Sequence, residues 1–120
     1  MLSVTENKGI QSDLIPRIAT GFCGGMARTG NMCGAVSGAI MAVNIFHGRM
    51  DATSTLDQNY AKVRELIAHF EKKFGTTNCK GLIGCDLATP EGHQFFKENN
   101  LIARCKVFSE EATRMVMTII

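Results

Sequence analysis

Large apolar side chains recur at intervals of three and four residues between positions 56 and 74, and this spacing restricts the fold more than any other pattern. The residues are Leu56, Tyr60, Val63, Ile67, Phe70 and Phe74. Residues spaced in this way share one face of an α-helix, because a helix turns once every 3.6 residues. Ser54 or Thr55 can cap the start, and Gly75 follows the end. The spacing therefore predicts a long amphipathic helix over residues 55–74.

The other segments are also typical of helices separated by glycine-rich breaks, and no stretch alternates as a strand would. The expected helices cover residues 13–20, 31–46, 79–83, 89–99 and 102–120, the third of them as a single short turn. Composition is that of an ordinary globular domain, with 45% apolar and 20% charged residues. We therefore predict an all-α fold, with residues 1–120 as a single domain. It would be a helical bundle of about five helices with a Gly-rich loop at residues 21–26.

Small residues recur every four positions in the helix expected over residues 31–46. Gly30, Gly34 and Gly38 mark the repeat, and alanines lie beside them at positions 35, 39 and 42. Glycine costs about 1 kcal/mol relative to alanine inside a helix. The repeat therefore indicates a smooth face against which another helix or a ligand packs closely.

Charge and hydropathy exclude several classes of function. Thirteen basic and 11 acidic residues give a net charge of +2 and are interleaved along the chain. Without a basic stripe, no nucleic-acid binding is expected. The longest apolar stretch, residues 32–46, is shorter than the roughly twenty residues that span a bilayer. Residues 1–9 are too polar for a signal peptide. We expect a soluble, cytoplasmic protein with no membrane span.

Five cysteines are many for a cytoplasmic chain of 120 residues: Cys23, Cys33, Cys79, Cys85 and Cys105. In a reducing compartment, cysteines serve redox or metal chemistry more often than structural disulfides. No two have the CxxC spacing of a zinc ribbon or a thioredoxin-type pair, so spacing alone does not predict a shared site. The alternative without any chemical role is that each cysteine is a small buried apolar residue.

Local sequence context favours chemistry at some of these cysteines. Cys33 lies near the start of the glycine-faced helix, where free N–H groups and the helix dipole would lower the pKa of its thiol. Cys79 opens its own short helix in a similar setting, whereas Cys105 is expected on the buried face of the last helix. The glycine-rich loop can fold around a ligand, so its predicted cofactor-binding residues are Cys23, Gly24, Gly25 and Arg28.

Histidines and carboxylates give weaker signals. His47 is expected to interact with a helix C-terminus, and His69 and His93 are expected to be exposed on their helices. No Ser-His-Asp arrangement and no pair of carboxylates stands out. The sequence therefore assigns no enzyme class.

Several motifs together resemble one known family. Residues 33–38 read Cys-Gly-Ala-Val-Ser-Gly, residues 19–28 contain a glycine-rich run ending in Met-Ala-Arg, and residues 70–86 contain Phe-Gly followed by Cys-Lys-Gly-Leu-Ile-Gly-Cys-Asp. In this order they resemble the redox-active family named for its pattern C…GCAxxG…C…C, a motif shared with split-Soret cytochrome c. The match covers about residues 15–118. The order Cys-Gly-Ala differs from the Gly-Cys-Ala of the family name.

The resemblance implies a helical redox protein in which Cys33, Cys79 and Cys105 correspond to three of the four family cysteines. The fourth belongs to an N-terminal helix that we expect this chain to lack, so Cys85 or Cys23 would replace it. The implied metal ligands are Cys33, Cys79, Cys85 and Cys105, holding an iron–sulfur cluster for electron transfer.

Two alternatives remain open. Without a metal, Cys33, Cys79 and Cys105 would act as redox thiols, with Cys33 attacking and one of the others resolving. In either redox case an unidentified redox partner exchanges the electrons. The second alternative is a non-catalytic interaction or assembly protein, in which the glycine–alanine face packs helices, as in a homodimer, and the cysteines are spectators.

Overall fold

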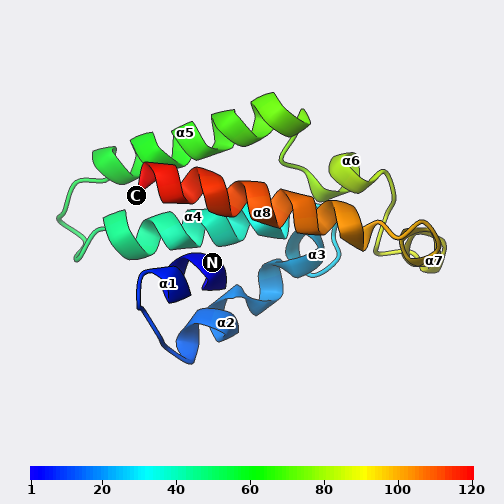
Figure 1. Cartoon of the computed structure of the whole chain (residues 1–120), viewed down its shortest axis with the longest axis horizontal. Coiled ribbons are helices and arrows are strands. Elements are labelled where there is room, and N and C mark those ends of the chain that lie inside the picture. The colour runs from blue at the N-terminus through cyan, green and yellow to red at the C-terminus, as the bar shows by residue number, and fades with distance from the viewer.

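A computed structural model describes residues 1–120, and its regular elements are all helical (Figure 1). They are α1 (Leu2–Asn7), α2 (Leu14–Ala19), the 3-10 turn η1 (Thr20–Phe22), α3 (Cys23–Met26), α4 (Gly34–His47), α5 (Asp57–Phe74), α6 (Cys79–Ile83), α7 (Pro90–Glu98) and α8 (Ile102–Ile119). The predicted all-α fold is confirmed. The expected number of about five helices is too low, because α1 and α3 fall in segments without a helical apolar repeat.

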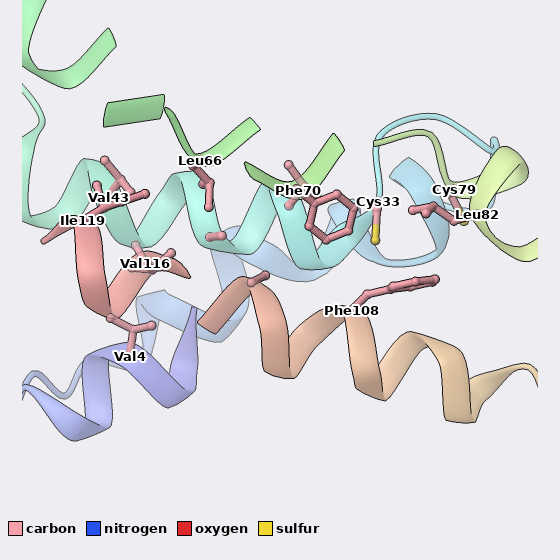
Figure 2. Packing of buried hydrophobic residues seen from close by; sticks show 14 of the residues in the cluster. Val4, Cys33, Val43, Leu66, Phe70, Cys79, Leu82, Phe108, Val116 and Ile119 are labelled. Atoms are coloured by element: carbon pink, nitrogen blue, oxygen red, sulfur yellow. The ribbon is translucent and has the colours of Figure 1, made fainter. Parts of the chain in front are cut away.

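Three long helices build the core. α4 and α8 run in the same direction, and α5 runs opposite to both beside them (Figure 1). The residues between them are almost completely buried and include Val36, Val43, Leu66, Phe70 and Val116. Phe70 and Phe74 of α5 pack on Phe108 of α8, with ring centroids 6.1 and 4.9 Å away. These aromatic contacts lie beside Cys33, whose sulfur points from the start of α4 toward Phe108 (Figure 2).

Helix α1 is held by packing and not by its own sequence. Its six residues are too few to form a stable helix alone. Val4 and Thr5 are fully buried, and α1 packs against α8. The Thr5 hydroxyl donates a hydrogen bond to the Leu2 carbonyl oxygen (3.0 Å). Only these two positions of α1 are buried, and the other residues of the segment 1–9 are mostly polar. The sequence of this segment therefore did not indicate a helix.

The expected glycine-rich loop contains a left-handed turn of backbone. Five successive residues, 24–28, have φ between +54° and +69°. Glycine adopts such angles freely, whereas each L-residue with a side chain costs roughly 1–2 kcal/mol there. The Ala27 N–H donates to the Cys23 carbonyl oxygen (2.9 Å) and closes the turn. Met26, Ala27 and Arg28 are therefore held in a conformation that the surrounding structure imposes.

Helix α4 begins three residues later than predicted, because residues 31–33 pair with residues 77–79. Met32 and Asn78 form an isolated antiparallel bridge. The Cys33 N–H donates to the Thr77 carbonyl oxygen, and the Cys79 N–H donates to that of Asn31, both at 2.7 Å. This pairing fixes the start of α4 against the start of α6.

The remaining helices follow the sequence closely. Helix α6 covers residues 79–83 as predicted, and α5, α7 and α8 begin or end within about two residues of their expected limits. The Thr89 hydroxyl caps α7 by accepting from the Gly92 N–H (3.0 Å), with Pro90 at the first helical position. None of the helices combines the length and apolarity that crossing a membrane requires.

Candidate functional site

Cys33 and Cys79 lie on the same side of the backbone bridge between residues 31–33 and 77–79. Side chains along an extended segment alternate between its two faces, and directly opposed residues share a face. Cys33 is opposite Thr77 and Cys79 is opposite Asn31, since their N–H groups bond to those residues. The two cysteines are therefore diagonal neighbours, with a Cα separation of about 7–8 Å typical of such pairs.

Two glycines allow the turn of α3 to lie directly against this bridge. A Cβ atom at Gly25 would collide with Cβ of Cys79 and would lie 3.0 Å from backbone atoms of Asn31. A Cβ atom at Gly34 would lie 3.0 Å from the Phe22 carbonyl oxygen and 3.5 Å from Cα of Cys23. Only residues without side chains allow these close contacts. The contact between Gly34 and Cys23 places Cys23 at the start of α4, next to Cys33.

Four cysteines from four segments line one cavity of about 1040 Å³. They are Cys23 of α3, Cys33 at the start of α4, Cys79 of α6 and Cys105 of α8. The loop residues predicted to bind a cofactor, Gly24, Gly25 and Arg28, line it too. So do Gly34 and Gly38 of the small-residue face of α4, and the remaining wall is mostly apolar. Cys85 is half-buried and is not among the lining residues.

Burial governs the acidity of the innermost thiols. Burial raises the pKa of Cys33, and the smaller opposing effect comes from hydrogen bonds with the N–H groups of Ala35 and Val36. The expected lowering of the Cys33 pKa at the helix start is therefore wrong, because burial outweighs those N–H groups. Burial, and then the charges of Cys33, Cys105 and Cys85, raise the pKa of Cys79 to about 11.

Burial also raises the pKa of the thiols of Cys105 and Cys85. Burial raises the pKa of Cys105, as does the nearby charge of Cys33, whereas the Arg104 charge lowers it. Burial raises the pKa of Cys85, with a further rise from Asp86. Their mutual effects place Cys33, Cys79, Cys85 and Cys105 in one neighbourhood, although they are far apart in sequence.

The thiols are near one another but are not arranged as ligands of a metal ion. Nowhere does the structure bring three or more His, Cys, Asp or Glu side chains together as a ligand set. Four thiolates are the common ligands of an iron–sulfur cluster, so the residue type suits one. The arrangement of Cys33, Cys79, Cys85 and Cys105 does not form such a ligand set, and Cys85 does not line the cavity.

His93 is the site residue that sequence reasoning missed. It was expected to be exposed, but it is half-buried and lines the cavity together with Phe96, one turn further along α7. Its Nδ1 atom is buried and has no hydrogen-bond partner. The spacing of three residues between His93 and Phe96 is the signal that could have placed it on the inner face of α7.

Comparison with known proteins gives one family match. No curated protein and no solved structure matches the chain. A sequence model of one family, described as "Putative redox-active protein (C_GCAxxG_C_C)", matches residues 1–119. Because that match covers almost the whole chain, the protein belongs to the C_GCAxxG_C_C family of redox-active proteins.

Proposed function

We propose that this protein is a thiol–disulfide redox protein in which Cys33 and Cys79 form the reactive pair and Cys105 is the neighbouring third thiol. The observation that carries the proposal is the convergence of four cysteines on one apolar cavity, two of them on the same face of a backbone bridge. Membership of a redox-active family supports the same class of chemistry. The cytoplasm expected from the sequence would keep the pair reduced between reactions.

The reaction is an exchange with the disulfide of a redox partner. The Cys33 thiolate attacks one partner sulfur, the partner S–S bond breaks, and a mixed disulfide forms while the first partner thiolate leaves. The Cys79 thiolate then attacks Cys33 and releases the second partner thiolate. The protein loses two electrons and two protons, and the partner gains two of each as its disulfide becomes two thiols.

Geometry and acidity predict a slow exchange at neutral pH. Disulfides have Cα separations of about 4.4–6.8 Å, slightly shorter than the diagonal distance typical of the bridge. A diagonal pair such as Cys33 and Cys79 must therefore move slightly closer before a disulfide forms. Because the thiolate is the attacking form and burial raises both pKa values, the rate should increase as pH rises.

The test is to purify the protein without oxygen, measure iron and acid-labile sulfide, and count thiols before and after mild oxidation. We expect protein without stoichiometric iron, the loss of two thiols on oxidation, and a peptide that links Cys33 to Cys79 by mass spectrometry. Cys33→Ser should abolish that link, and Cys23→Ser should leave it intact.

Two results would overturn the proposal. Stoichiometric iron and sulfide that disappear in Cys33→Ser would establish an iron–sulfur protein for one-electron transfer. Protein without metal whose thiols resist oxidation would favour the non-catalytic interaction or assembly protein with spectator cysteines.

A further inference from the structure

The thiol cavity opens beside a second cavity that carries positive charge. The second cavity has a volume of about 620 Å³ and lies between α7 and the turn of α3. Both cavities are lined by Arg28, Leu87 and His93, so they adjoin. We call the second cavity the mouth, and its charged lining residues are Arg28, Lys97 and Glu98.

The cations of the mouth have no partners within the protein. The three ion pairs of the structure join Lys73 and Arg114 to Glu111 and Lys80 to Asp86. Neither Arg28 nor Lys97 takes part in them. Glu98, the single acid of the mouth, accepts a hydrogen bond from Gln94 (2.7 Å). With two cations and one acid, the mouth carries a net positive charge, and neither cation is ion-paired.

The position of Arg28 has an energetic cost. Arg28 ends the left-handed turn of residues 24–28 and has φ of +67°. Its side chain lies over Gly24, where a Cβ atom would be 3.1 Å from Cγ of Arg28. Non-glycine residues held at such angles cluster at binding sites, where the surrounding structure enforces them. Here the enforced turn brings a guanidinium to the junction of the two cavities.

His93 supplies the remaining polar group at that junction. Buried nitrogen atoms almost always have a hydrogen-bond partner, and Nδ1 of His93 has none. The thiol cavity itself is apolar, is walled on one side by Gly34 and Gly38, and is of the size that takes small organic ligands.

We propose that the thiol cavity and its mouth bind a low-molecular-weight organic anion, whose apolar body lies against the glycine face of α4 and whose acidic group lies at Arg28 and Lys97. As a statement about which partner reacts with the thiol pair, this inference rests on the proposed function. Binding, however, is measured without any redox step, so the two proposals can fail separately.

The experiment titrates the reduced protein with two fluorescent probes of similar shape, 1-anilinonaphthalene-8-sulfonate and the neutral N-phenyl-1-naphthylamine. We expect one molecule of either probe per protein. The double variant Arg28→Gln, Lys97→Gln should weaken the sulfonate about tenfold, because two charged donors are lost. It should leave the neutral probe within about twofold. Lys72→Gln, on the exposed side of α5, is the matched control and should change neither affinity.

The chain contains no tryptophan, so an introduced one reports the position of the probe. Ser109→Trp lies on the cavity wall, whereas Tyr60→Trp lies on the exposed side of α5. Energy transfer to the bound sulfonate should be strong from the first variant and weak from the second. Far-UV circular dichroism of every variant checks that the helices are retained.

Three results would overturn the inference. They are the absence of sulfonate binding to the wild-type protein, an unchanged affinity in the double variant, and an equal loss of both probes. Because neither probe contains a disulfide, sulfonate binding with unreactive thiols would refute the proposed function alone. Thiol exchange without sulfonate binding would refute this inference alone.

Discussion

At the scale of single residues, the surroundings of a cysteine decide its reactivity more than its place in a helix does. Cys33 and Cys79 both begin helices, yet both are buried and burial raises the pKa of each. Cys23 lines the same cavity but is exposed. The five thiols should therefore react with small reagents at very different rates.

We predict that iodoacetamide modifies Cys23 first and Cys33 and Cys79 last in the folded protein. The rate at Cys79 should rise about tenfold per pH unit up to about pH 11, because the thiolate fraction rises by that factor below the pKa. Peptide mass spectrometry after timed quenching measures each rate. Unfolding in guanidinium should make the five rates similar, and early modification of Cys79 at pH 7 would contradict the prediction.

Gly25 is a glycine at the site whose replacement should be clearly destabilising. Gly25→Ala adds a collision with Cys79 to the cost of a positive φ, and we expect a loss of about 2–5 kcal/mol in the free energy of unfolding. Gly75→Ala is the control, because Gly75 also has a positive φ but has open space around it, and it should cost about 1–2 kcal/mol. Urea titration compares the two, and equal losses would show that the Cys79 contact does not matter.

At the scale of elements, the sequence predicts helices well where the signal is local. The apolar repeat of α5 and the Thr89–Pro90 start of α7 lie within the segments that they define, and both helices form there. The bridge between residues 31–33 and 77–79 depends on atoms forty-six residues apart, so no local pattern reports it. The left-handed turn of residues 24–28 likewise follows from packing that the glycines permit but do not specify.

The residues of the candidate site were likewise predictable only where a local sequence pattern indicates them. Family motifs pointed to Cys33, Cys79 and Cys105, and the glycine-rich loop pointed to Cys23 and Arg28. Burial of Cys33 and Cys79 was not predictable, because it depends on the pairing of residues 31–33 with residues 77–79, which no local pattern reports. The pKa of Cys33 and the orientation of His93 were therefore missed.

Helix α7 offers a test of a single capping contact. Thr89→Ala removes the hydroxyl that accepts from the Gly92 N–H, and we expect the free energy of unfolding to fall by about 1 kcal/mol. Thr89→Ser keeps the hydroxyl and should recover most of that loss. Urea unfolding measures both variants. If the serine variant were as unstable as the alanine variant, the cap would not be the source of the effect.

At the scale of the whole molecule, the buried thiols couple folding to pH. The folded protein holds the protons of Cys33, Cys79 and Cys105 more tightly than the unfolded chain does, since burial raises all three pKa values. The stability that comes from these protons is fully present below about pH 9, the ordinary pKa of a cysteine. Between about pH 9 and pH 11 it is lost, because the unfolded chain binds fewer protons there.

We therefore predict that the free energy of unfolding falls between about pH 9 and pH 11 in reduced protein. Cys79→Ala should remove much of this decline, because Cys79 has the pKa of about 11. Urea titrations at a series of pH values give the slopes, and equal slopes for wild type and Cys79→Ala would contradict the assignment.

The left-handed turn of residues 24–28 also has a consequence for chirality. Ala27 has φ of +54° and ψ of +43°, angles that are unfavourable for an L-amino acid and natural for its mirror image. In a chemically synthesised chain, D-alanine at this position would fit the native backbone without strain, whereas D-alanine inside α4 would disrupt the helix. The molecule thus contains, within a chain of L-residues, a site whose geometry prefers the opposite hand.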